Sequence, residues 1–109
     1  IKSIKFNTFN QFRNLSEIFL KNNQIKKLNS LIFGNLPKLK QIDLANNELE
    51  IIDSKAFNRS NSLEIIWLNN NKLFYIEDST FNELPKLQSI KLFNNLSKFV
   101  DLVHDYEYL

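Results

Sequence analysis

The apolar positions of this chain repeat every 24 residues. Each unit opens with leucine, has isoleucine three residues later and leucine two residues after that. Equivalent positions of successive units form a column, and the first three columns are Leu15, Leu39, Leu63 and Leu87; Ile18, Ile42, Ile66 and Ile90; and Leu20, Leu44, Leu68 and Leu92. Further columns at the same period are Ile25, Leu49 and Leu73; Leu28, Ile52 and Ile76; Phe33, Phe57 and Phe81; and Leu36, Ser60 and Leu84. Three complete units thus make 21 such positions, and 20 hold a large apolar residue, whereas a chain that is 43% hydrophobic would place about nine there by chance. The repeat is therefore a structural unit.

The second and third columns predict a short strand in every unit. Their residues are two positions apart, which is the period of a strand, so both side chains point to one face. The remainder of the unit carries apolar residues at wide, irregular spacing and must return the chain to the next strand. A unit this small cannot bury its apolar face alone, so successive units stack and bury it between them. Ser60 and Asn61, in "FNRSNSL", should pack less well than the matching residues of neighbouring units.

Asparagine recurs at one position of each unit, directly after the predicted strand. These residues are Asn23, Asn47, Asn71 and Asn95. They stand where the chain must turn inward, and buried backbone groups at such a corner need hydrogen-bond partners. An asparagine amide offers both donors and an acceptor. We therefore expect a stacked structural ladder of four asparagines.

The unit "LxxLxLxxNxLxxIxxxxFxxLPx" resembles the leucine-rich-repeat family, in its typical class from extracellular animal proteins such as Toll-like receptors and insect immune repeat proteins. "FGNLPKL" at 33–39 and "FNELPKL" at 81–87 are especially similar to that consensus. The resemblance implies an α/β solenoid: a right-handed horseshoe segment with a short parallel sheet on the concave face and irregular or 3-10 turns on the convex side. It also implies an extracellular or secreted protein, although this chain lacks the cysteines of the caps that such proteins usually carry.

The repeats divide a single domain, 1–109, into five parts. A partial repeat at 1–14 precedes full repeats at 15–38, 39–62 and 63–86, and a divergent last repeat occupies 87–109. In that last segment Phe99, Leu102, Val103 and Tyr106 are spaced as one face of a helix, with Ser97 as its N-cap. Such a C-terminal helix would cover the end of the stack. The chain opens at Ile1 without methionine or a signal-peptide pattern, as expected of a mature form or a fragment.

The residues that flank the inward-facing strand positions should point outward from the concave sheet. Among them are two phenylalanines, an isoleucine and the only tryptophan, and large apolar side chains on an exposed face mark interaction sites. We expect this face to bind another protein or a peptide through the apolar anchors Phe19, Ile65, Trp67 and Phe93. Charged neighbours would set specificity, and these are Asp43, Lys91, Lys21 and Glu17.

Composition excludes several other classes of function. The net charge of +2 arises from 14 basic and 12 acidic residues, which gives no reason to expect nucleic acid as a partner. No apolar run is long enough to span a membrane. The chain has no cysteine and one glycine, so thiolate chemistry and a glycine-rich phosphate loop are both excluded. The single histidine, His104, lies near Asp101 and Asp105 as on a solvated helix face. We therefore expect neither an enzyme nor a cofactor or metal site.

The sequence also allows for glycosylation and for self-association. Asn14 and Asn58 lie in glycosylation sequons on the outside of the predicted coil, whereas the sequon at Asn95 belongs to the buried column. A stack of repeats also presents unpaired strand edges, so self-association into a dimer or fibre is the alternative to recognition of a partner.

Overall fold

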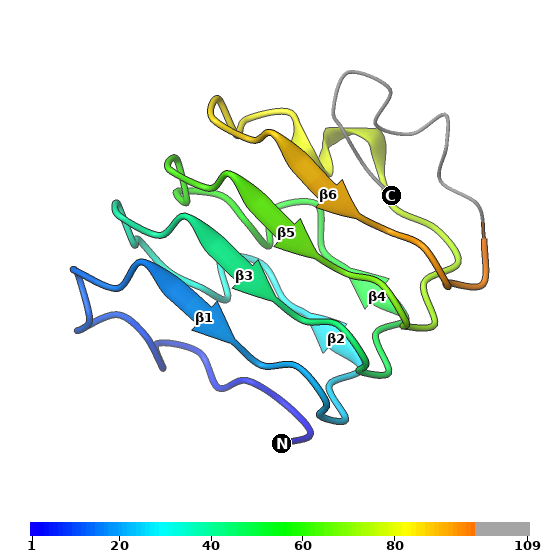
Figure 1. Ribbon diagram of the computed structural model, residues 1–109. Coiled ribbons are helices and arrows are strands. Elements are labelled where there is room, and N and C mark those ends of the chain that lie inside the picture. Colours follow the sequence, from blue (N-terminus) through cyan, green and yellow to red (C-terminus); the bar gives the residue numbers. More distant parts are fainter. Residues whose placement is uncertain (98–109) are drawn as a thin grey trace.

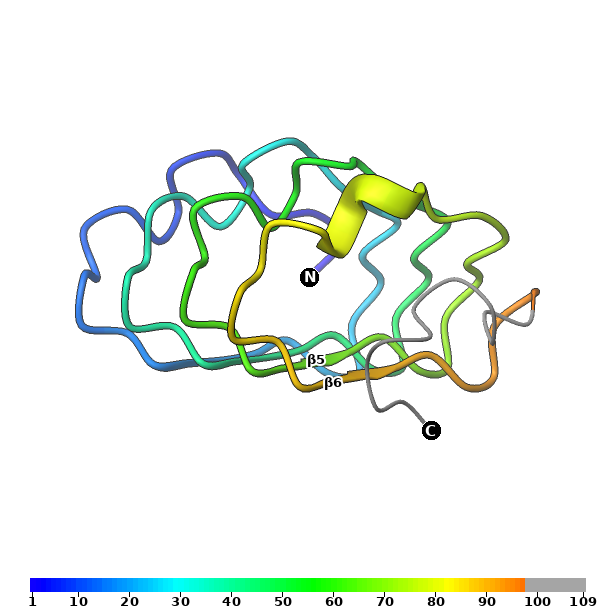
Figure 2. The same cartoon turned by 90° about the horizontal axis from the view of Figure 1, so that it is seen from above.

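The computed structural model describes residues 1–97 as a coil of successive turns with parallel strands (Figure 1). A four-stranded sheet has the order β1 (Glu17–Phe19), β3 (Gln41–Asp43), β5 (Ile65–Trp67) and β6 (Ser89–Lys91). A smaller parallel pair joins β2 (Lys27–Leu28) to β4 (Ile51–Ile52). One 3-10 helix, η1 (Asp78–Phe81), lies across the coil from the four-stranded sheet, as the view from above shows (Figure 2). The predicted solenoid fold is confirmed.

The register of the sheet equals the period of the sequence. Ile18 pairs with Ile42, Ile42 with Ile66, and Ile66 with Ile90, each 24 residues apart. The central residue of each strand in the four-stranded sheet is buried, with at most 4% of its surface exposed, because it points into the coil. Parallel strands normally need a crossover of a dozen or more residues, and the irregular half of each repeat supplies it.

Phenylalanine rings fill the side of the coil away from the strands. Phe9, Phe33, Phe57 and Phe81 form one continuous stack, with ring centroids separated by 6.2, 5.7 and 5.9 Å. The last three rings are fully buried, whereas Phe9 is half-buried in the first turn. Ile1 and Phe12 stand 24 residues before Ile25 and Leu36, in the same columns, but remain 65% and 52% exposed, because the first turn has a neighbour on only one side in this chain.

The residue before each ladder asparagine adopts a left-handed backbone conformation. Asn22, Asn46, Asn70 and Asn94 have φ between 56° and 62°. Asparagine tolerates this region better than most non-glycine residues do. The repeated Asn-Asn pair therefore has two separate causes: the first asparagine allows the turn and the second satisfies the backbone around it. Only the second cause was evident from the sequence pattern.

Ser60 is the weak position of the convex side, as the sequence indicated. Its side chain is fully buried in the column between Leu36 and Leu84, and its hydroxyl has no hydrogen-bond partner among the described residues. Asn61, by contrast, lies in solvent. A buried hydroxyl without a partner costs about 1–3 kcal/mol, so this turn lowers the stability of the stack.

Replacing Ser60 with leucine is expected to raise the free energy of unfolding by about 1–2 kcal/mol, because the leucine buries apolar surface and removes the unpaired hydroxyl. Ser60→Ala should give a smaller gain, since it only removes the hydroxyl. The control is Ser62→Ala, which should destabilise because the Ser62 hydroxyl donates a 2.6 Å hydrogen bond to the Pro37 carbonyl. Urea unfolding measures all three. A loss of stability in both Ser60 variants would contradict the assignment.

The predicted C-terminal helix and the His104 cluster lie outside the described residues. Within residues 1–97, no helix has the length and apolar character that a membrane span requires.

Candidate functional site

The sheet presents one outward face, which we call the concave face, built from three columns of side chains. The first column is Glu17, Gln41, Ile65 and Ser89, and the second is Phe19, Asp43, Trp67 and Lys91, each paired in register across the strands. The third column follows the strands and consists of Lys21, Ala45, Asn69 and Phe93. Backbone hydrogen bonds from Asn22 to Ala45, Asn46 to Asn69 and Asn70 to Phe93 extend the ladder through it. All eight residues predicted to contact a partner therefore lie on this face.

The apolar residues of the concave face form two groups. Phe19 is 61% exposed on β1, and Asp43 separates it from Trp67 in the register. Two strand spacings amount to about 10 Å, so Phe19 stands apart. The second group is centred on Trp67: Ile65 lies two residues before it on β5, and Phe93, two residues beyond the end of β6, lies diagonally from it on the neighbouring turn. The predicted anchors are thus one outlying ring and one cluster.

Trp67 is more covered than a wholly exposed sheet face would allow. The flanking residues Ile66 and Leu68 are fully buried, so Trp67 faces outward as predicted, but its side chain is half-buried. The Lys91 ammonium lies 5.6 Å from the centroid of its ring, within the range of a cation–π interaction. The indole Nε1 is buried and has no partner among the described residues. The ring therefore lies against the sheet surface instead of projecting freely into solvent.

The charged residues of the concave face differ in their exposure to solvent. Glu17 and Lys21 are exposed, whereas Asp43 and Lys91 are half-buried. The Asp43 carboxylate already accepts a 3.0 Å hydrogen bond from the Ala45 backbone N–H, which turns it along the strand. Glu17 and Lys21 are consequently the charges that a partner meets first.

Two polar residues of the concave face are buried, which the sequence did not predict. Asn69 and Ser89 are each 7% exposed, and the Asn69 Oδ1 and Ser89 Oγ atoms have no hydrogen-bond partner in residues 1–97. Buried polar atoms are normally paired. The only sequence signal was the additional asparagine at the start of "LNNNKL", Asn69, which precedes the usual pair. The tryptophan cluster therefore lies beside unpaired polar atoms.

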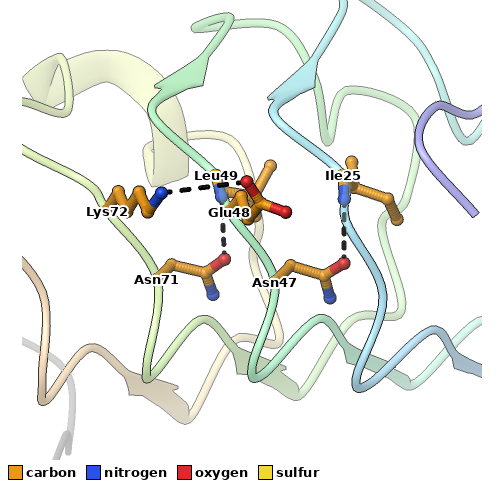
Figure 3. A network of polar contacts seen from close by, with 6 residues as sticks. All are labelled: Ile25, Asn47, Glu48, Leu49, Asn71 and Lys72. Atoms are coloured by element: carbon orange, nitrogen blue, oxygen red, sulfur yellow. Dashed lines mark hydrogen bonds and ion pairs between the residues drawn. The ribbon is translucent and has the colours of Figure 1, made fainter.

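The asparagine ladder fixes the backbone beneath this face. Figure 3 shows Asn47 and Asn71 on adjacent turns, each with Oδ1 directed at a backbone N–H of the preceding turn. The distances are 3.1 Å to Ile25 and 2.9 Å to Leu49. Asn95 repeats the contact with Leu73 at 3.0 Å, and Asn23 accepts from the N-terminal amine at 2.8 Å. Each turn is thereby joined to the next.

Side-chain amide groups complete the ladder. The Nδ2 atoms of Asn47, Asn71 and Asn95 donate to the carbonyls of Leu20, Leu44 and Leu68 at 2.9–3.0 Å. Lys72 and Glu48 also bridge adjacent turns at 3.7 Å, on the surface, where such ion pairs contribute little (Figure 3). The ladder therefore acts as a structural element that holds the strands in register.

The glycosylation sequons, a second apolar strip and the metal-ligating side chains are the remaining candidates among residues 1–97. Asn14 is exposed and Asn58 half-buried. Ile51, Phe74 and Tyr75 form an apolar strip outside the concave face, each more than 60% exposed, next to a shallow hollow. Among residues 1–97, no group of three metal-ligating side chains is close enough to hold a metal ion.

The parallel sheet, the 24-residue turns and the asparagine ladder define a leucine-rich-repeat solenoid. The profile of the BspA type leucine rich repeat region matches residues 1–108 in six copies, so the chain belongs to this family. The predicted leucine-rich-repeat assignment is confirmed. No curated protein sequence matches the chain significantly.

Among solved structures, the chain is similar to a protein in the "Crystal structure of TLR13-ssRNA13 complex", with a TM-score of 0.79 and 31% sequence identity. The match covers 86% of this chain but only 15% of that one. The chain therefore spans only a small part of the length of that protein. Leucine-rich repeats of this kind form interaction modules and are generally not enzymes.

Proposed function

We propose that this protein is a non-catalytic recognition module that binds another protein or a peptide through its concave face. The observation that carries the proposal is the group of Ile65, Trp67 and Phe93 on the outward face of the four-stranded sheet, where Phe93 is 43% exposed and Ile65 and Trp67 are half-buried. Phe19, at 61% exposure, extends the apolar surface to the other edge of the sheet. Aromatic side chains that lie near the centre of a rigid surface are the residues that most often dominate binding energy.

Rigidity of the scaffold supports this proposal. The sheet is held in register by the ladder beneath it, so a partner meets a preformed surface and little ordering is needed on binding. Charged side chains at the rim, Glu17 and Lys21, would steer the partner and select its orientation. The similar solved protein is in a TLR13-ssRNA13 complex, which is consistent with a role in recognition for a repeat protein of this fold. We further propose an extracellular or surface-associated location, with Asn14 as the more accessible of the two glycosylation positions.

The partner can be found and placed by site-directed photo-crosslinking. A photoreactive phenylalanine analogue at Phe19 or Phe93 should crosslink to the partner, because both rings are exposed on the concave face. The same analogue at Lys86, on the convex side, is the control and should not crosslink. Crosslinking from Lys86 but from neither concave position would place the interface on the other side of the coil and contradict the proposal.

Trp67→Ala is then expected to weaken binding of that partner by at least about 2 kcal/mol, or roughly thirtyfold, as for an interface hot spot. Because Trp67 is half-buried, we expect a loss of stability of about 1–2 kcal/mol, smaller than the about 2–5 kcal/mol for Leu68→Ala in the core. Titration calorimetry and urea unfolding measure the two quantities. Unchanged affinity in a folded Trp67→Ala variant would exclude the concave face.

Self-association is the second candidate. The exposed apolar residues of the first turn, Ile1, Phe6 and Phe12, and the unpaired outer edge of β1 favour it. Mass measurement over a concentration series distinguishes the two. A constant monomer mass supports a separate partner, whereas a rising mass that Phe12→Ser suppresses supports stacking of copies.

A further inference from the structure

A surface pocket of about 250 Å³ lies on the convex side of the first three turns, away from the concave face. Its lining comes from three separate stretches of the chain: Phe6, Asn7, Asn10 and Arg13; Leu31, Gly34 and Asn35; and Arg59. The pocket is independent of the proposed partner surface, because none of these residues belongs to the concave columns. Its volume suits a small ligand or one end of a larger one.

The pocket collects the only two arginines of the chain. Twelve of the 14 basic residues are lysines, and no lysine lines the pocket, whereas Arg13 and Arg59 both do, although they are 46 positions apart. No acidic residue is in the lining. The one ion pair within residues 1–97 joins Lys72 to Glu48, so neither guanidinium is neutralised by a described carboxylate. The pocket therefore carries two uncompensated positive charges.

Arginine differs from lysine in the ligands that it selects. The guanidinium is planar, always charged and able to donate two parallel hydrogen bonds to one oxyanion. Lysines on the rest of the surface serve as dispersed, solvated charges. Two arginines that line one pocket from different turns suit an oxyanion with two negative charges, because each guanidinium can pair with one edge of it.

The other walls of the pocket are polar on one side and apolar on the other. The Asn10 amide donates a 2.6 Å hydrogen bond to the Asn7 Oδ1, which holds both side chains at the rim. Gly34, the only glycine of the chain, has φ +68°, and a Cβ there would collide with the Asn10 side-chain oxygen. The glycine thus permits Asn10 to close against the second turn. Phe6 and Leu31 supply the apolar wall.

We infer that this pocket binds a phosphate monoester whose organic part is apolar or aromatic. Arg13 and Arg59 clamp the dianionic phosphate, Asn35 borders it as a hydrogen-bonding group, and Phe6 with Leu31 contacts the organic substituent. The arginines are exposed, so solvent screens their charges and the affinity is modest. No covalent step is involved.

Isothermal titration of the 109-residue chain tests the inference with phenyl phosphate, inorganic phosphate, phenyl sulfate and phenol at about pH 7.5, where a phosphate monoester is largely dianionic. Phenyl phosphate should bind saturably and more tightly than inorganic phosphate, because only the ester has a ring for Phe6 and Leu31. Phenol should not bind. Phenyl sulfate, a monoanion of similar shape, should bind about tenfold more weakly, as expected from the loss of one charge-assisted contact.

Matched variants distinguish binding in the pocket from nonspecific attraction to the positive charge of the protein. Arg13→Gln and Arg59→Gln should each weaken phenyl phosphate binding by about tenfold, the effect expected for a lost hydrogen bond to a charged group. Lys86→Gln removes the same charge from the far end of the convex side and should leave the affinity unchanged. Absence of saturable phenyl phosphate binding, equal losses for Lys86→Gln and Arg59→Gln, or equal affinity for phenyl sulfate would each overturn the inference. Circular dichroism confirms that the variants remain folded.

Discussion

Replacing Phe57 with alanine is expected to lower the free energy of unfolding by about 3–5 kcal/mol and to abolish cooperative folding. Phe57 is fully buried, and its ring lies between those of Phe33 and Phe81 at centroid distances of 5.7 and 5.9 Å. Removal of the ring leaves a void in the middle of the stack and severs both ring contacts. Because domains of this size have a total stability of only about 5–15 kcal/mol, a loss of this magnitude removes much of it.

Cooperative unfolding of this chain follows from its solenoid architecture. Each turn contacts only its neighbours, so stability is the sum of the turns and the interfaces between them. A void at Phe57 weakens two interfaces at once and divides the coil into halves that are too small to fold separately. Urea unfolding followed by circular dichroism measures the loss of stability and of cooperativity.

Two control variants make the result specific. Phe57→Leu retains most of the volume and should recover much of the loss. Phe19→Ala makes the same chemical change at a ring that is 61% exposed and should alter stability by less than about 1 kcal/mol. A near-native unfolding curve for Phe57→Ala would show that the ring stack does not hold the coil together.

Asn47→Ala is expected to cost about 2–4 kcal/mol, because it leaves buried backbone groups without partners. The Asn47 side chain accepts from the Ile25 N–H and donates to the Leu20, Leu44 and Ala45 carbonyls, at distances of 2.9–3.3 Å. It is 7% exposed, so solvent cannot replace these contacts in the folded state. Thermal and urea unfolding both measure the change.

The preceding residue is the natural comparison. Asn46 is exposed, and its amide donates only to the Asn22 Oδ1 at 2.9 Å, but its φ is 56°. Asn46→Ala should therefore cost about 1 kcal/mol through the left-handed backbone, and Asn46→Gly should restore most of that loss. Equal unfolding midpoints for Asn46→Gly and Asn47→Ala would contradict the ladder as the main source of polar stability in the turns.

The sequence predicts which residues lie on the concave face, but it does not predict the conformations of their side chains. Alternation in the strands places Phe19 and Trp67 outward, and the structure agrees. The separation of Phe19 from the Ile65, Trp67 and Phe93 cluster also follows from the register. The burial of the Trp67 indole Nε1 does not follow from the register, because it depends on side-chain conformations and on packing between neighbouring columns.

Features that recur in every repeat follow from the amino-acid sequence alone. The period of 24 gives the strand register, the inward isoleucines, the stack of phenylalanines and the asparagine ladder, since identical turns must place identical residues side by side. Ser60 is a defect for the same reason: it breaks a column whose other members are apolar. Each of these features depends only on the position of a residue within the repeat.

Contacts between residues at different positions of the repeat arise only in the folded coil. Arg13 and Arg59 differ by 46 residues, two short of two full periods, so column counting places them in different columns. They reach one pocket because the convex turns are irregular, with left-handed residues at Asn7, Leu31, Gly34 and Arg59 that redirect the chain differently in each turn. Backbone conformations of this kind depend on the packing of each turn against its neighbours, and that packing exists only once the coil has formed.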